Sequence, residues 1–137
     1  MGKSLDHIGV AVQDTEAALK LYRDALGLKV EHSEIVADQG VKATMLALGG
    51  THIELLEPMG PDTPVGKSIA ARGEGIHHIS IAVPNVAEAL AAAQAAGLRL
   101  IDQTPRVGAG GKLIAFLHPK SCGGVLIELS QKGTESE

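Results

Sequence analysis

Aromatic side chains are nearly absent from this chain of 137 residues, which has one tyrosine, one phenylalanine and no tryptophan. A surface that stacks nucleic-acid bases needs several aromatic rings, so Tyr22 and Phe116 alone exclude such a platform. Apolar residues nevertheless make up 45% of the chain. The hydrophobic core must therefore be built from alanine, valine, isoleucine and leucine.

Cysteine is also scarce, and the lone Cys122 cannot form an intramolecular disulfide. This favours a reducing compartment, so we expect a cytoplasmic protein, and it argues against a thiolate-rich structural zinc site. No apolar run is long enough to cross a bilayer, so we expect no membrane partner. The net charge of −4 argues against a nucleic-acid partner, which normally meets a basic protein face.

What the sequence does contain is an internal repeat. The segment LDHIGVAV (residues 5–12) returns as IHHISIAV (76–83), and GGTHIELLE (49–57) returns as GGVLIELS (123–130). His7 thus corresponds to His78, 71 residues later, and Glu54 corresponds to Glu128, 74 residues later. The two offsets differ by only a few residues, which changes in loop length can absorb, and such recurrence of matched residues is typical of two fused copies of one structural unit.

Each copy is predicted to fold as one strand, one helix and three strands. Alternating residues predict first strands at 6–12 and 77–83, with each histidine on a face of small residues. Asp14 or Thr15 can cap a helix over 15–26 that ends at Gly27, and Asn85 can cap its counterpart over 86–96, ending at Gly97. The remaining strands are expected at 28–36, 41–48 and 51–57, and at 98–103, 113–118 and 124–130.

The predicted fold class is therefore α+β, with two tandem βαβββ modules that form a metal-containing cleft. We expect one domain over 1–137, with the first module at 4–57 and the second at 75–130. A connection at 58–74 should hold a short helix near 66–72, and 131–137 should form a frayed polar tail.

Two histidines and two glutamates related by the repeat predict a divalent-metal site made of His7, Glu54, His78 and Glu128. Each glutamate lies in an Ile-Glu-Leu strand, where a solvent-facing carboxylate would be the ordinary interpretation. Its recurrence in step with a histidine favours metal binding. Four nitrogen and oxygen ligands leave room for a bidentate substrate.

Other polar residues are weaker candidates for binding a substrate. His52 shares a face with Glu54, although its counterpart in the repeat is Leu126. Arg106 and Lys112 flank a glycine-rich loop that could approach an anion, and Lys120 lies in a second such turn. The alternative for both segments is a plain flexible loop. The remaining histidines are expected to serve structure: His32 at the surface, His77 in packing or in support of the site, and His118 in a turn.

Several segments together resemble the vicinal oxygen chelate superfamily, also called glyoxalase/bleomycin resistance proteins, and within it the methylmalonyl-CoA epimerase family. The resemblance covers nearly the whole chain. It is carried by DHIG (6–9), GEGIHHI (73–79), RVGAGG (106–111) and HPKSCGGVLIEL (118–129). It implies paired βαβββ modules and the same four ligands. It also implies one divalent ion per chain, cobalt first, with zinc, manganese or nickel as alternatives.

The resemblance further implies a homodimer with an acyl-CoA substrate, methylmalonyl-CoA, whose 2R and 2S forms interconvert by proton removal and return at C2 through an enolate. Glu128 is then both ligand and catalytic base, while the loops around Arg106 and Lys120 suit the CoA end. Some epimerases carry a glutamate, proposed as a base, where this chain has Ala43. The second acid–base group stays open between His52, Lys112 and a metal-bound water.

Three other functions share parts of this pattern. A glyoxalase I-type lactoylglutathione lyase has the same ligand set and also moves a proton between carbons. A non-enzymatic, ligand-sequestering protein of the superfamily generally lacks the full ligand set. An extradiol dioxygenase needs only two histidines and one glutamate, usually in a longer chain. The Gly-Ile-His-His and His-Pro-Lys-Ser segments favour the epimerase.

Overall fold

The computed structural model describes residues 2–132, so most of the predicted tail at 131–137 lies outside the described residues. The chain divides into two compact units. Residues 7–77 form what we call the N-terminal unit, and residues 78–132 together with 2–6 form the C-terminal unit. Among the described residues, no helix has both the length and the apolar character to cross a membrane.

The N-terminal unit contains a four-stranded sheet with the order β2-β3-β4-β1. β1 pairs with β4 in parallel, whereas β2, β3 and β4 pair antiparallel. The helix α1 continues directly into a π-helical segment, Lys20–Ala25. The bounds are β1 (Ser4–Ala11), α1 (Thr15–Leu19), β2 (Val30–Val36), β3 (Val41–Leu48), β4 (Thr51–Pro58) and α2 (Pro64–Arg72).

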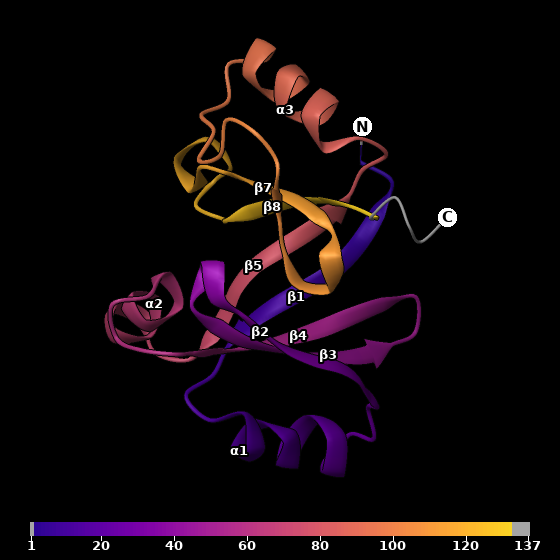
Figure 1. Cartoon of the computed structure of the whole chain (residues 1–137), viewed down its shortest axis with the longest axis vertical. Coiled ribbons are helices and arrows are strands. Elements are labelled where there is room, and N and C mark those ends of the chain that lie inside the picture. The colour runs from indigo at the N-terminus through magenta and orange to yellow at the C-terminus, as the bar shows by residue number, and fades with distance from the viewer. Residues whose placement is uncertain (1, 133–137) are drawn as a thin grey trace. The chain divides into compact units, whose positions relative to one another are not determined.

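The C-terminal unit repeats this arrangement with the strand order β5-β8-β7-β6. Here β5 pairs with β8 in parallel, and β8, β7 and β6 pair antiparallel. The bounds are β5 (Gly75–Ala82), α3 (Val86–Ala95), β6 (Arg106–Val107), β7 (Leu113–Leu117) and β8 (Ile127–Gln131). The α+β class and the order strand, helix, three strands are thus confirmed in both halves (Figure 1).

The helices begin where the sequence predicts. Asp14 accepts a hydrogen bond from the backbone N–H of Glu16, and Asn85 accepts one from that of Glu88. Each cap satisfies a backbone donor that the first helical turn leaves without a partner. Gly27 and Gly97 follow the two helical segments with φ of 79° and 88°, which only glycine adopts at little cost.

Each unit has its own aliphatic core, on the sheet face that its helix covers (Figure 1). In the N-terminal unit, Leu19 of α1 packs with Leu46 and Leu55 of the sheet. In the C-terminal unit, Leu90 of α3 packs with Leu129. Because one face of each sheet is filled by these side chains, the opposite face is left for the histidines and glutamates.

One predicted strand is wrong. Residues 98–103 do not form a strand, and only Leu100 makes an isolated bridge, to Leu117. The Asp102 carboxylate accepts a hydrogen bond from the backbone N–H of Phe116 at 2.8 Å. In a regular strand pairing, a backbone carbonyl would accept this hydrogen bond instead. Local hydrogen bonding by aspartate competes with sheet formation in this way. The second strand of this half is instead the two-residue β6.

A polar contact between Thr15 and Glu57 links the start of α1 to β4. The backbone N–H and the hydroxyl of Thr15 donate to one Glu57 carboxylate oxygen at 2.8 and 2.7 Å. The hydrogen bond from the Thr15 side chain, then that from its backbone, lowers the pKa of Glu57 below its ordinary value of 4.5. The ionised carboxylate therefore stabilises the fold, and that contribution depends on pH.

We predict that Glu57→Gln lowers the free energy of unfolding by roughly 1 kcal/mol near neutral pH, because a neutral acceptor replaces a charged one. Since the folded pKa is depressed, the contribution of Glu57 is present above pH 4.5 and is lost as the pH falls through the folded value. Urea unfolding of the wild type and of Glu57→Gln should show that the difference between their free energies of unfolding becomes smaller as the pH is lowered. A constant difference would contradict this, and Glu16→Gln serves as the exposed control.

Candidate active site

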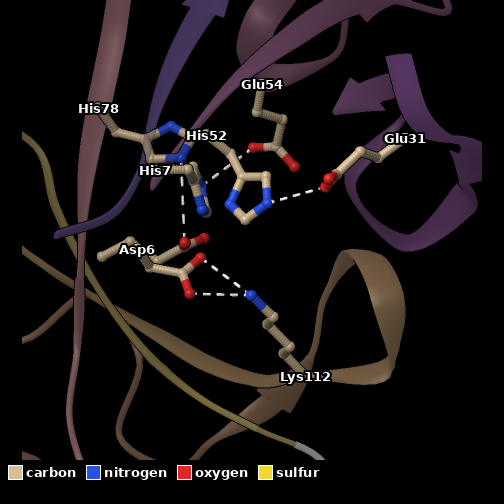
Figure 2. Close-up of polar contacts among 8 residues, drawn as sticks. Asp6, His7, Glu31, His52, Glu54, His78 and Lys112 are labelled. Atoms are coloured by element: carbon tan, nitrogen blue, oxygen red, sulfur yellow. Dashed lines mark hydrogen bonds and ion pairs between the residues drawn. The ribbon is translucent and has the colours of Figure 1, made fainter. Parts of the chain in front are cut away.

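The first histidine–glutamate pair lies within the N-terminal unit. In the parallel pairing of β1 with β4, Gly9 lies beside Glu54, and His7 lies on the same strand face two residues earlier. His7 Nε2 is 3.1 Å from Glu54 Oε1, and Figure 2 shows the two side chains pointing toward each other. Both side chains are buried, at 6% exposure each. The repeat in the sequence thus marks a real contact.

The second pair lies within the C-terminal unit at equivalent strand positions. Ser80 of β5 lies beside Glu128 of β8, and His78 precedes Ser80 by two residues. His78 Nε2 is 3.9 Å from Glu128 Oε1, with side-chain exposures of 4% and 5%. This separation exceeds hydrogen-bond distance, so the second pair is more open than the first.

Buried histidine and glutamate side chains are suitable donors for a divalent cation. His7, Glu54 and His78 each present a ligand atom and are buried, and Glu128 is 4% exposed. A buried carboxylate is costly unless a positive charge compensates it. Imidazole nitrogen with carboxylate oxygen fits Co²⁺, Zn²⁺, Mn²⁺ or Ni²⁺. The donor chemistry of both pairs therefore fits the expected cofactor.

An aromatic ring supports the second pair. The Phe116 ring meets the His78 ring edge to face, with centroids 5.6 Å apart. On Phe116 lies Arg106, whose guanidinium carbon is 5.6 Å from the ring centroid and whose Nε is 3.5 Å from Asp102. Arg106, expected to flank a glycine-rich loop that could approach an anion, is therefore anchored beside the ring that contacts His78. Sequence reasoning did not assign a role to Phe116 or Asp102.

Lys112 is held by a partner that sequence reasoning did not single out. Its Nζ lies 2.8 Å from Asp6 Oδ1 and 3.1 Å from Asp6 Oδ2, both residues belonging to the C-terminal unit (Figure 2). The two residues are 106 positions apart in the chain, so no local pattern indicates the pair. The cation of Lys112 is therefore partly neutralised and fixed in place.

Lys120 is exposed and lies in the short 3₁₀ turn Pro119–Ser121. The backbone N–H of Lys120 donates to His118 Nδ1 at 3.1 Å, which confirms His118 as a turn-forming residue. Desolvation, followed by the charges of Arg99 and Lys120, lowers the pKa of His118. The imidazole is therefore neutral near pH 7 and can accept this hydrogen bond.

His52 of β4 has a carboxylate partner, Glu31 of β2, in the same unit. Its Nε2 is 2.9 Å from Glu31 Oε1, and its side chain is 32% exposed (Figure 2). The pairing register of β2 shifts between Val30 and His32, and this irregularity leaves Glu31 as an extra residue. The sequence did not reveal the bulge, so Glu31 was not foreseen.

Ala43, at the position where some epimerases carry a glutamate, offers no titratable group. Ala43 is buried at 4% exposure and lies beside Leu56 in the β3–β4 pairing. His32 is 53% exposed and pairs with Glu34 at 2.6 Å, as expected of a surface histidine. The proton-accepting side chains of the N-terminal sheet are thus found elsewhere than at Ala43.

Comparison with known proteins identifies the family to which this chain belongs. Residues 6–116 match the model of the glyoxalase/bleomycin resistance protein/dioxygenase superfamily. The chain is 41% identical to the mitochondrial methylmalonyl-CoA epimerase of Mus musculus, over 93% of this chain and 72% of that protein. It is 39% identical to an ethylmalonyl-CoA/methylmalonyl-CoA epimerase of Cereibacter sphaeroides, over 93% of this chain and 96% of that protein.

A solved structure shows the same fold. A methylmalonyl-CoA epimerase in complex with methylmalonyl-CoA and NH₄⁺ superposes with a TM-score of 0.94 at 38% sequence identity, covering 98% of this chain and 97% of that one. The predicted superfamily and family are both confirmed by these matches. The chain belongs to the glyoxalase/bleomycin resistance/dioxygenase superfamily and, within it, to the methylmalonyl-CoA epimerase family.

Proposed function

We propose that this protein interconverts (2R)- and (2S)-methylmalonyl-CoA by removing the proton at C2 and returning it to either face. The observation that carries the proposal is the pair of buried His–Glu contacts at equivalent strand positions, in a chain of the epimerase family. A C2 proton lies between a thioester carbonyl and a carboxylate, and a divalent cation is suited to stabilise the charge left when it departs.

In this proposal His7, Glu54, His78 and Glu128 together hold one divalent ion per chain, with cobalt first and zinc, manganese or nickel as alternatives. When bound, the ion supplies a positive charge for the developing thioester oxyanion. The chain supplies imidazole nitrogens and carboxylate oxygens as ligands, and their burial excludes water from that charge. Two further properties stay predictions. The resemblance implies a homodimer, and the single cysteine implies a cytoplasmic location.

Glu128 is the proposed base on one face of C2. Its carboxylate lies 3.9 Å from His78 Nε2, whereas Glu54 lies 3.1 Å from His7 Nε2. Glu54 is therefore the glutamate that lies closer to its histidine, which suits a purely ligating role. Inversion requires a second acid–base group on the other face. His52, oriented by Glu31, and Lys112, held by Asp6, are the candidate side chains.

The CoA end of the substrate carries several phosphates, which cations recognise. Lys120 is exposed, Arg106 lies against Phe116, and Lys112 is paired with Asp6. Lys120 is thus the cation best suited to reach a phosphate, while the other two suit the acyl portion. This divides the three basic residues between the two ends of the substrate.

The decisive experiment is deuterium incorporation at C2 of methylmalonyl-CoA in heavy water, followed together with inversion of configuration. Protein stripped with EDTA and reloaded with each candidate metal should exchange and invert the substrate. The adduct of glutathione and methylglyoxal serves as the alternative substrate. If the protein converted that adduct without exchanging the proton at C2 of methylmalonyl-CoA, it would be a lactoylglutathione lyase and not an epimerase.

We predict that His78→Ala abolishes tight metal binding and activity while the protein stays folded, because the histidine lies outside the aliphatic cores of either unit. Metal content by mass spectrometry, turnover and circular dichroism test this. His32→Ala, which alters an exposed His–Glu pair, is the control and should behave as the wild type. A folded His78→Ala protein with stoichiometric metal and normal turnover would disprove the ligand assignment.

We predict different results for the two glutamates. Glutamine keeps a ligand oxygen but accepts a proton poorly, so Glu128→Gln should reduce kcat by about 100-fold or more, as expected for loss of a general base. Glu54→Gln should retain much of the activity. Metal content measured beside kcat separates lost ligation from lost proton transfer. Small and equal effects would show that neither carboxylate is the base.

A further inference from the structure

A buried hydroxyl next to Glu128 has no structural role that the fold accounts for. Ser80 is fully buried, at 0% exposure, on β5. Among residues 2–132, its Oγ has no hydrogen-bond partner. Burying an unsatisfied hydroxyl destabilises a protein by roughly 1–3 kcal/mol, and alanine would avoid that cost. Such a group in a native core calls for an explanation in function.

The strand register places this hydroxyl at the proposed base. Ser80 and Glu128 are partners in the parallel β5–β8 pairing, so their side chains leave the sheet on the same face, from strands about 4.8 Å apart. On the other side of Glu128, its partner in the β7–β8 pairing is Phe116. A phenyl ring cannot donate a conventional hydrogen bond. Of the two lateral neighbours of Glu128, only Ser80 can donate one.

The first module lacks this donor. Glu54 lies between Gly9 of β1 and Met45 of β3, in the equivalent pairings. Neither side chain can donate a hydrogen bond. The repeat therefore preserves the two His–Glu pairs, yet it differs at the residue beside each carboxylate, with glycine in one copy and serine in the other. A serine hydroxyl thus lies beside Glu128, the proposed base, and no hydroxyl lies at the equivalent position beside Glu54.

We propose that Ser80 is a positioning residue whose hydroxyl donates to the Glu128 carboxylate in the working site and fixes the direction in which that carboxylate faces C2. One carboxylate oxygen is thereby oriented by the protein, while the other is left to ligate. This inference rests on the proposed function. It explains why a destabilising hydroxyl is kept buried on the sheet face opposite the aliphatic core.

The test compares Ser80→Ala, Ser80→Thr and Ser130→Ala. Ser130 is the matched control because it is a buried serine, at 1% exposure, two residues after Glu128 on the same strand. Four quantities are measured for each protein: Tm, the Kd for Co²⁺ by titration calorimetry on metal-free protein, kcat, and KM for methylmalonyl-CoA. The first two do not depend on turnover.

For Ser80→Ala we expect a Tm equal to or above that of the wild type, because an unsatisfied hydroxyl is removed. We expect the Kd for Co²⁺ to rise about tenfold, as for loss of a residue that orients a metal ligand. We expect kcat to fall about tenfold at little-changed KM. Ser80→Thr keeps the hydroxyl and should restore kcat. Ser130→Ala should leave kcat and the Kd for Co²⁺ near the wild-type values.

The inference is overturned if Ser80→Ala keeps wild-type kcat and metal affinity, or if its Tm drops, since a drop would show a structural hydroxyl. An equal loss of kcat in Ser130→Ala would also overturn it. If Ser80→Thr does not fold, the alanine variants decide the matter alone. A wild-type protein that exchanges C2 deuterium while Ser80→Ala is unimpaired refutes this inference only. A wild type that neither binds Co²⁺ nor exchanges refutes the proposed function and this inference with it.

Discussion

The parallel pairing of the first and last strands of each module is the constraint on which the site depends. β1 pairs with β4, and β5 pairs with β8, so a histidine and a glutamate distant in sequence lie on one sheet face. A register shift of one residue would turn the carboxylate to the opposite face. That opposite face is occupied by aliphatic side chains, including Leu55 at 0% and Leu129 at 3% exposure. The packing of each core therefore fixes the register, and the register fixes which histidine and glutamate share the opposite face.

Burial suits the two histidine–glutamate pairs to metal binding and also makes their carboxylates costly. Glu54 and Glu128 are 5% and 4% exposed, with histidines as their near neighbours. A carboxylate removed from water needs a compensating charge or hydrogen bonds. Aliphatic cores of the kind found here supply neither, so the polar face of each sheet depends on its own histidine and on what it binds. Activity in this family is thus obtained at some expense of stability, a common property of active sites.

The two modules are alike in backbone and unlike in the surroundings of the carboxylate. The His–Glu distance is 3.1 Å in the first and 3.9 Å in the second. The second also has an aromatic ring against His78, which the first lacks at the corresponding pairing. A symmetric set of donors is sufficient to bind a cation, whereas inversion at one carbon needs a group that accepts a proton on one face and a group that donates a proton on the other. Duplication accounts for the first property, and divergence between the copies accounts for the second.

The sequence by itself determined the repeat, the α+β class, the helix caps at Asp14 and Asn85, and the four proposed ligands, because these depend on local periodicity and on matched positions. It did not determine the partners of His52 and Lys112. Glu31 reaches His52 through a strand irregularity, and Asp6 reaches Lys112 across 106 positions of chain. It also predicted a strand at 98–103, which the hydrogen bond from Phe116 N–H to Asp102 replaces. Those outcomes belong to the tertiary structure, since only the folded chain decides which distant donors and acceptors meet.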